Sequence, residues 1–194
     1  IGDGGTFKGI DKGDTRISEG GLKNIHGTPY YSAFEACVQS VMASFNSWNG
    51  VKMHGHEYLL TDVLRDQMGF NGLVVGDWNG HGEVPGCTNA NCPESFNAGV
   101  DIYMAPDEWK ELYTNTVRAV KSGDISEDRL DDAVRKILTV KDRLGMLDGR
   151  KPHEYENYVG KIEHRELARE AVSKSLVLLK NCLLYTSPSP RDRQ

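Results

Sequence analysis

Apolar runs alternate with helical patterns along this chain, and their spacing constrains the fold more than any other feature. Four runs predict β-strands, at residues 40–45, 72–76, 99–104 and 175–179. The second and fourth are almost continuously apolar, which is typical of strands buried on both faces of a parallel sheet. The first three begin about thirty residues apart, the size of one strand–helix unit. The spacing therefore predicts an α/β protein with a parallel sheet.

The segments around these runs carry the periodicity of helices. Apolar side chains fall on one stripe within residues 31–39, 56–68 and 109–121. Gly69 and Gly123 follow the second and third of these patterns, where a glycine commonly ends a helix. The pattern thus predicts one helix after another between or beside the strands.

Two further helical patterns follow. Residues 124–147 are predicted to form a helical hairpin that begins with Ser126, since a serine at this position accepts a hydrogen bond from a backbone N–H of the first turn. Residues 164–173 are predicted to form a helix that leads into the last strand.

Three consecutive strand–helix units fit either a (β/α)8 barrel or a doubly wound sheet. A complete barrel takes roughly 250 residues, so the chain has room for only the second half of a TIM-like barrel. We assign residues 1–147 to this half barrel and the polar stretch 148–163 to a linker. Residues 164–181 are assigned to the first elements of a second α/β domain.

The two ends of the chain do not resemble natural termini. Ile1 is not an initiator methionine and no targeting segment precedes it, so we expect a natural start further upstream. Residues 182–194 resemble the translation of a sequencing-library adapter, and the alternative is a short Ser/Pro-rich linker. On the first interpretation the natural sequence ends at Asn181.

The composition excludes several classes of function. A net charge of −5 argues against a nucleic-acid interface, which needs a basic face. No stretch approaches the roughly 18 consecutive apolar residues of a membrane span. Residues 2–6 are glycine-rich, but their spacing is not that of a dinucleotide-binding loop and no strand precedes them. Nucleic acid, a membrane span and a bound cofactor are therefore not expected.

The turn after the second predicted strand is the most informative candidate for a functional site. Active sites of parallel α/β folds collect at the carboxyl ends of the strands, and Asp77 stands where this strand ends. Rigid backbone holds a carboxylate there, and the ring of Trp78 offers a flat apolar face to a sugar. The alternative is that Asp77 only caps the next helix, a position that aspartate favours.

The end of the first predicted strand offers a mixed signal. Met42 and Phe45 stand three residues apart, a spacing more typical of a core than of a pocket. Residues 46–50, however, combine asparagine, serine and tryptophan, the composition of a loop that faces carbohydrate. Both interpretations stay open at this point.

Histidines and acidic residues elsewhere are weaker candidates. His54 and His56 are potential metal ligands, but no third ligand stands at a suitable spacing, so no metal site is predicted. His81 and Glu83 lie in the loop after the second strand, where they either edge a pocket or stay in solvent. Asp101 stands inside an apolar strand, and because a buried carboxylate needs partners, we predict a structural role.

The cysteines divide into a pair and a single residue. Cys87 and Cys92 enclose four residues in a loop, and a disulfide between them is favoured over two free thiols. Such a disulfide implies an oxidising compartment. Cys37 lies on an apolar helix face and is predicted to be a buried thiol.

Several ordered motifs recur at the spacing of one known enzyme family. They are Gly2-Asp3-Gly4-Gly5-Thr6, Asn24-Ile25-His26 with Pro29-Tyr30, Ser40–Gly50 with Lys52-Met53-His54, Leu60–Leu64 with Gly69-Phe70, and Gly72–Trp78. Together they resemble glycoside hydrolase family 3, and the similarity extends over residues 1–181. The chain is most similar to β-glucosidases and exo-acting β-1,3/1,4-glucanases of that family.

The resemblance implies a two-domain enzyme, in which a (β/α)8 barrel supplies the nucleophile and a following α/β sandwich domain supplies the general acid/base. Asp77 matches the nucleophile, and Met42, Phe45 and Trp78 match positions that line the glucose pocket and its outer subsite. Two positions depart from the pattern. Many relatives have serine at Gly76, and many have tyrosine in place of Phe45, so a hydroxyl near the nucleophile is lost.

The implied reaction removes terminal β-D-glucosyl residues from β-glucosides or β-glucans by double displacement with retention. The nucleophile attacks the anomeric carbon, and a second carboxyl about 5–5.5 Å away protonates the leaving oxygen and then activates water. Glu83, Asp107 and Glu108 are the local candidates for that second carboxyl, and none matches a family motif. The family's sugar-binding Lys-His pair would lie upstream of Ile1.

A non-catalytic interpretation stands beside this one, in which the chain is a carbohydrate-binding or inert fragment. A half barrel leaves unpaired strand edges and an uncovered apolar interior. We therefore expect the isolated chain to fold poorly and to be inactive. The cysteine pair and the habit of similar enzymes indicate a periplasmic or secreted protein.

Overall fold

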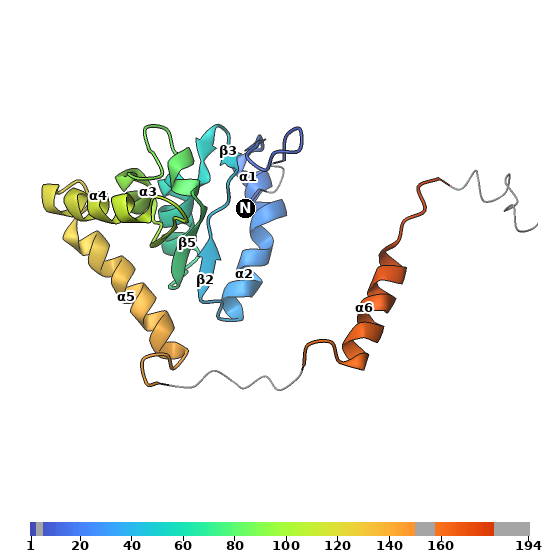
Figure 1. The fold of residues 1–194 in the computed structure, drawn as a ribbon. Coiled ribbons are helices and arrows are strands. Elements are labelled where there is room, and N and C mark those ends of the chain that lie inside the picture. Colours follow the sequence, from blue (N-terminus) through green and yellow to red (C-terminus); the bar gives the residue numbers. More distant parts are fainter. Residues whose placement is uncertain (3–5, 150–157, 181–194) are drawn as a thin grey trace, which may run out of the picture. The chain divides into compact units, whose positions relative to one another are not determined.

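A computed structural model describes residues 1–2, 6–149 and 158–180. The chain divides into two compact units, Ile1–Arg150 and Lys151–Gln194 (Figure 1). The sequence places the boundary of the first domain three residues earlier, after residue 147. The stretch interpreted as an adapter lies outside the described residues.

Two small three-stranded sheets form in the first unit (Figure 1). One contains β1 (Asp14–Thr15), β3 (Ser47–Trp48) and β4 (Val51–Lys52), and the other contains β2 (Ser40–Met42), β5 (Leu73–Trp78) and β6 (Ile102–Met104). In the second sheet β5 lies between β2 and β6 and pairs in parallel with both. The predicted parallel pairing of the first three apolar runs is confirmed, although β2 and β6 are shorter than predicted and β5 is longer.

Helical segments surround these strands. They are α1 (Glu19–Gly21), η1 (Leu22–Gly27), α2 (Thr28–Glu35), η2 (Met53–Gly55), η3 (Tyr58–Gln67), η4 (Gly80–Glu83), α3 (Pro93–Ala98), α4 (Trp109–Ser122) and α5 (Glu127–Arg143). The helices predicted at 31–39, 56–68 and 109–121 correspond to α2, η3 and α4. Of these, η3 is wound as a π-helix.

Local signals set the ends of α4 and α5. Gly123 follows α4 with a φ of 87°, a left-handed conformation that glycine adopts without steric cost. The hydroxyl of Ser126 accepts a hydrogen bond from the Arg129 N–H, as predicted for a capping serine. The predicted hairpin within 124–147 is wrong, since one helix, α5, occupies most of that range. Its apolar periodicity continues without a break until Gly145, which also has a positive φ.

The two faces of the β2–β5–β6 sheet differ in burial. On one face Val74 is 0% exposed and Ala43 2% exposed, and both belong to the main apolar core with side chains from η3. On the other face Met42, which pairs with Val75, is half exposed. The strand predicted to be buried on both faces at 72–76 is β5, in which Leu73, Val74 and Gly76 are buried and Val75 is partly buried.

A tight hairpin joins β3 and β4. Asn49 and Gly50 both have positive φ, the conformation of a two-residue type I′ turn. The Trp48 ring is 9% exposed, and its Nε1 donates to the Ile17 carbonyl oxygen at 2.8 Å. The interpretation of residues 46–50 as a carbohydrate-facing loop is wrong for Trp48, because the indole N–H finds its partner in the protein interior.

Asp101 has the structural role predicted for it. Its side chain is fully buried and forms ion pairs with Arg65 of η3 and Arg129 of α5. It also accepts the backbone N–H of Val74 at 2.8 Å. These contacts compensate the cost of burying a charge in the middle of the molecule.

Cys37 differs from the prediction. It is exposed and has a φ of 60°, because α2 ends at Glu35 and the chain turns before β2. The side chain therefore leaves the apolar stripe on which the periodicity had placed it.

The second unit contains α6 (Ile162–Ser175), which corresponds to the helix predicted at 164–173. The strand predicted at 175–179 is wrong: Ser175 ends the helix, and residues 176–180 form no strand. Leu176, Val177, Leu178 and Leu179 are all exposed. An apolar run becomes a strand only when another strand accepts its backbone hydrogen bonds, and the described residues of this unit offer none.

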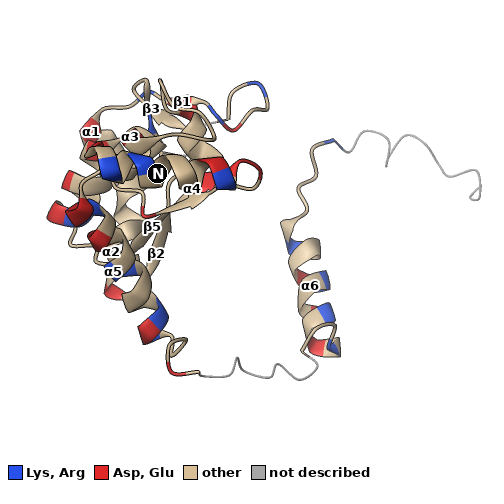
Figure 2. Ribbon diagram, turned by 60° about the vertical axis from the view of Figure 1, so that its left-hand side comes forward, with Lys and Arg blue, Asp and Glu red and all other residues tan. Residues whose placement is uncertain are grey.

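Charged residues of both signs are interspersed along α5 and along α6 (Figure 2). No helix among the described residues combines the length and the apolarity needed to cross a bilayer.

Candidate functional site

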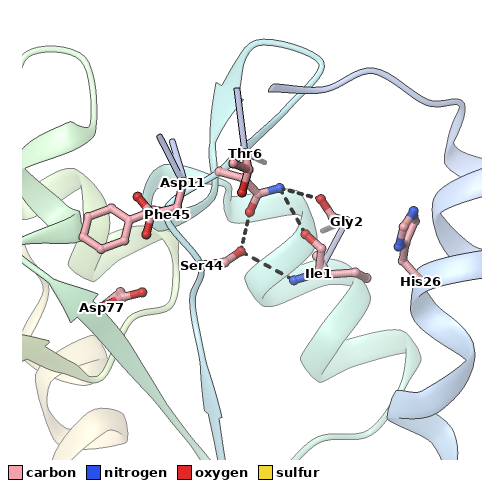
Figure 3. Close-up of a pocket in the computed structure, with 9 residues that line it drawn as sticks. Ile1, Gly2, Thr6, Asp11, His26, Ser44, Phe45 and Asp77 are labelled. Carbon is pink, nitrogen blue, oxygen red and sulfur yellow. Dashed lines mark hydrogen bonds between the residues drawn. The ribbon is translucent and has the colours of Figure 1, made fainter. Parts of the chain in front are cut away.

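A cavity of about 370 Å³ opens where β2 and β5 end. Figure 3 shows Asp77 and Phe45 on one side of it and His26 on the other. The lining residues come from the N-terminal segment, from η1 and from the ends of both strands: Ile1, Gly2, Thr6, Asp11, His26, Ser44, Phe45, Asn46 and Asp77. The cavity thus lies at the carboxyl edge of a parallel sheet, where the sequence predicts the site.

Asp77 occupies an irregular part of its strand. Between Val75 and Trp78, β5 advances three residues while β6 advances two, from Ile102 to Met104. Pairing with β2 stops at Val75, because β2 ends. An extra residue of this kind changes the direction of side chains and is common beside active sites. The Asp77 side chain lines the cavity from this irregular position.

Two hydrogen bonds fix Asp77. Its backbone N–H donates to Nε2 of His54 at 2.8 Å, and its Oδ1 accepts the backbone N–H of Trp78 at 2.7 Å. The residue that precedes the short helix η4 is Asn79. Asp77 is therefore not the cap of the next helix, and this alternative from the sequence is wrong.

His54 is buried behind Asp77 and is 2% exposed. Burial lowers its pKa to about 4, and the neighbouring charge of Asp77 opposes that shift only in part. The ring is therefore neutral at neutral pH. Because Nε2 accepts a hydrogen bond, the proton resides on Nδ1. The backbone of Ser44 is hydrogen bonded to the same ring.

The residues predicted to bind substrate are placed differently from one another. Phe45 lines the cavity together with Asp77. Met42 lines a separate apolar cavity of about 50 Å³ beside η3. Trp78 is 59% exposed and does not line the cavity. Among the described residues, Phe45 thus shares the cavity with the candidate nucleophile, whereas Met42 and Trp78 do not line it.

Asn46 connects the segments that line the cavity through hydrogen bonds. Its amide nitrogen donates to the carbonyl oxygens of Ile1 and Gly2 and to the Thr15 hydroxyl, and its oxygen accepts from the Ser44 hydroxyl. This network joins the N-terminal segment to the end of β2. The sequence alone did not identify it, because the partners lie as far as 45 residues away.

Asp11 and His26 also line the cavity without having been identified from the sequence as site residues. Asp11 stands in a polar segment with no predicted strand beside it. His26 belongs to the motif Asn24-Ile25-His26, which contributed to the family resemblance but did not mark His26 as a site residue. Only the fold brings them to the carboxyl edge of the sheet.

The three local candidates for a second carboxyl do not line the cavity. Glu83 pairs with Lys12 at 2.5 Å and with Lys52 at 3.7 Å. The hydrogen bond from Lys12 is the main cause that lowers the Glu83 pKa. A carboxyl held in its ionised form is a poor general acid. Asp107 and Glu108 are exposed.

A disulfide and hydrogen bonds fix the loop after η4. A disulfide joins Cys87 and Cys92, and the Cys92 carbonyl accepts from the Tyr103 hydroxyl at 2.5 Å. His81 is 1% exposed and its Nε2 lies 2.8 Å from the Asn89 carbonyl oxygen. His81 is therefore neither in solvent nor at the cavity, the two positions considered for it.

Within the described parts of the chain, one group of side chains has the spacing of a metal site: Cys87, Cys92 and Glu94. Both sulfurs are engaged in the disulfide, so neither offers the thiolate that binds metal ions. His54 and His56 do not belong to this group.

Comparisons with known proteins find similarity to glycoside hydrolases. The family model described as "Glycosyl hydrolase family 3 N terminal domain" matches residues 1–140. A β-xylosidase of Formosa agariphila is 35% identical over 188 residues, which cover 90% of this chain and 26% of that protein. A periplasmic β-glucosidase of Salmonella typhimurium is 35% identical over 174 residues, which cover 84% of this chain and 22% of that protein.

A solved structure agrees with these matches. The exo-1,3/1,4-β-glucanase ExoP from a Pseudoalteromonas species superimposes with a TM-score of 0.83 at 52% sequence identity, covering 93% of this chain and 23% of that one. The chain spans about a quarter of the length of the curated relatives it matches.

Proposed function

The chain belongs to glycosyl hydrolase family 3, and from this premise we propose that it carries the nucleophile of a longer enzyme that removes terminal β-D-glucosyl residues with retention of configuration. The observation that carries the proposal is the position of Asp77. Its carboxylate lines a cavity at the carboxyl edge of the parallel sheet, and its backbone amide is fixed by a buried neutral histidine. Rigid placement of the reacting group is what a displacement reaction needs.

We propose that β2, β5 and β6 are three consecutive strands of a (β/α)8 barrel. Their order in the sheet follows their order in the chain, whereas a doubly wound sheet reverses direction at a switch point. One sheet face is covered by helices, and the face that carries Met42 is less buried, as expected where further strands complete a barrel. Residues 148–163 then form the linker, and residues 164–181 begin a sandwich domain.

In the proposed reaction the Asp77 carboxylate attacks the anomeric carbon as the bond to the leaving oxygen breaks. A general acid protonates that oxygen, and a covalent glycosyl-enzyme forms. The same group then removes a proton from water, which attacks the anomeric carbon and releases Asp77 with overall retention. We assign the acid/base to the second domain, because Glu83, Asp107 and Glu108 do not line the cavity.

The proposed substrate class is a β-glucoside or β-glucan with a free non-reducing end. The cavity volume of about 370 Å³ is near the lower end of the range for small-molecule sites. Phe45 offers an apolar ring beside Asp77 for one face of the sugar. We propose that Met42 and Trp78 complete the pocket once the rest of the barrel surrounds them. No cofactor takes part in this chemistry.

A periplasmic or secreted location is proposed with this function. The disulfide Cys87–Cys92 is the structural support for it, since disulfides persist in oxidising compartments. The relative from Salmonella typhimurium is itself described as periplasmic.

The test is to trap the covalent intermediate in the full-length protein. A 2-deoxy-2-fluoro aryl β-glucoside is incubated with the enzyme, and the labelled peptide is mapped by mass spectrometry. The expected label is on Asp77. Asp77→Asn is expected to abolish labelling and to lower kcat by roughly 10⁴-fold or more. Asp107→Asn is the matched control, because Asp107 is an exposed carboxylate outside the cavity.

Each alternative result has a distinct meaning. A label on another residue keeps the glycosidase and discards Asp77 as its nucleophile. Labelling by the 2-deoxy-2-fluoro xyloside in preference to the glucoside discards the glucosyl specificity. A folded protein that takes no label from either reagent favours the carbohydrate-binding alternative.

A further inference from the structure

His54 has no role in the reaction as described so far. The residue lies in η2, just after the β3–β4 hairpin, and does not line the cavity. Its ring nevertheless reaches the backbone of the candidate nucleophile. The imidazole therefore contacts the backbone of Asp77 and not the cavity.

The ring replaces strand pairing at the point where pairing stops. Pairing of β2 with β5 ends at Met42 and Val75, two residues before Asp77. Beyond this point, Nε2 of His54 accepts a hydrogen bond from the Asp77 N–H. The same ring is hydrogen bonded to the backbone of Ser44. His54 therefore bridges the ends of the two strands that carry the cavity.

The ring has little freedom to move. A Cβ atom built on Gly80 would lie 2.2 Å from Cε1 and Nε2 of His54, and one on Gly76 would lie 3.4 Å from Cδ2. The Phe45 ring packs on another side, with its centroid 6.1 Å from that of the imidazole. Backbone and ring contacts thus hold Nε2 opposite the Asp77 amide.

We propose that His54 is a positioning residue, which as a hydrogen-bond acceptor fixes the Asp77 amide and so aims the Asp77 carboxylate at the anomeric carbon. This inference rests on the proposed function. Burial keeps the imidazole neutral, which preserves the lone pair on Nε2. A protonated ring would present an N–H to an N–H, and the bond would be lost.

Two substitutions of His54 separate the acceptor from the volume of the side chain. In His54→Gln the amide oxygen can reach the place of Nε2 and accept the Asp77 N–H, whereas His54→Leu fills the space without an acceptor. We expect the rate of labelling and kcat to fall by about 10²-fold in His54→Leu, the cost of misplacing a reacting group by about 1 Å, and by less than about fivefold in His54→Gln. KM is expected to stay within about twofold of the wild-type value, because His54 makes no contact that binds the substrate in its ground state.

A second variant moves the ring without changing its chemistry. Gly80→Ala places a methyl group against the imidazole and is expected to lower kcat in the same direction as His54→Leu. Gly20→Ala is its control, since no heavy atom lies within 4 Å of a Cβ there. His56→Leu is the control for loss of a buried histidine, because His56 packs on Trp48 and does not contact Asp77.

The results distinguish failure of this inference from failure of the proposed function. If the wild-type enzyme is labelled on Asp77 and His54→Leu is labelled at the wild-type rate, His54 is not a positioning residue. Equal losses of kcat in His54→Leu, His54→Gln and His56→Leu overturn the inference as well, since they indicate a general loss of structure. If the wild-type enzyme takes no label, the proposed function fails first, and the positioning role fails with it.

Discussion

The Asp101 carboxylate lies 2.6 Å from the guanidinium of Arg65, with its side chain fully buried. Its other oxygen lies 2.9 Å from Arg129. Asp101 directly precedes β6, Arg65 lies in η3 and Arg129 in α5, so one carboxylate connects the sheet to two helices.

Asp101→Ala is expected to destabilise the full-length protein by about 3–5 kcal/mol, because it removes the buried counter-charge of Arg65 and leaves Arg129 with only its longer pair to the partly exposed Asp132. Urea unfolding followed by circular dichroism measures the loss. Asp132→Ala is the matched control: its side chain is 41% exposed and pairs with Lys136 and Arg129, so a change below about 1 kcal/mol is expected. Similar losses in both variants would contradict the assigned role of Asp101.

Stability is expected to fall as the pH decreases from about 6.5 to about 4. Burial lowers the pKa of His54 to about 4 from its ordinary value of 6.5, and it also lowers the pKa values of His56 and His81. In this window the unfolded chain binds more protons than the folded one, so acid favours unfolding. The contribution of His54 to the free energy of unfolding is fully present above pH 6.5 and amounts to roughly 3 kcal/mol.

The free energy of unfolding, measured by urea titration at several pH values from 7.5 to 4, tests this. His54→Gln, which has no titratable group at this position, is expected to show a shallower decrease. A wild-type stability that stays constant or rises toward pH 4 would rule out buried neutral histidines as the cause.

Phe45→Ala is expected to raise KM for an aryl β-glucoside by several-fold, since an aromatic contact contributes about 1 kcal/mol. Phe45 lines the cavity beside Asp77, and the ammonium group of Lys12 lies 5.3 Å from its ring centroid. Phe45→Tyr keeps the ring and is expected to retain the wild-type KM. Steady-state kinetics of both variants provide the measurement, and an unchanged KM in Phe45→Ala would remove Phe45 from the binding site.

Loss of the Cys87–Cys92 disulfide is expected to cost about 2 kcal/mol, because the bond restricts the unfolded chain. Dithiothreitol should therefore lower the Tm of the wild-type protein but leave the Cys87→Ala/Cys92→Ala variant unchanged. Cys37 is an exposed free thiol, which dithiothreitol leaves unchanged. An equal response of wild type and variant to dithiothreitol would show that the disulfide does not contribute.

Local patterns in the sequence determined much of the fold. The continuous apolar run at 72–76 predicts the buried strand β5, Ser126 and Gly123 mark the ends of two helices, and the position of Asp77 after a buried strand predicts the edge at which the cavity lies. These features depend on neighbours within a few residues, since periodicity, capping and turn preference act over that range.

Contacts between distant segments decided the features of the fold and of the candidate site that local patterns do not predict. His54 meets Asp77 across 23 residues, and Asp101 meets Arg65 across 36. Cys37 lies outside the core because α2 ends before it, Trp48 is buried because Ile17 accepts its N–H, and residues 176–179 form no strand although they are apolar. A sequence pattern states which side chains favour burial or pairing. Only the tertiary structure supplies the partner, because hydrogen bonds and ion pairs require two groups that the chain brings together by folding.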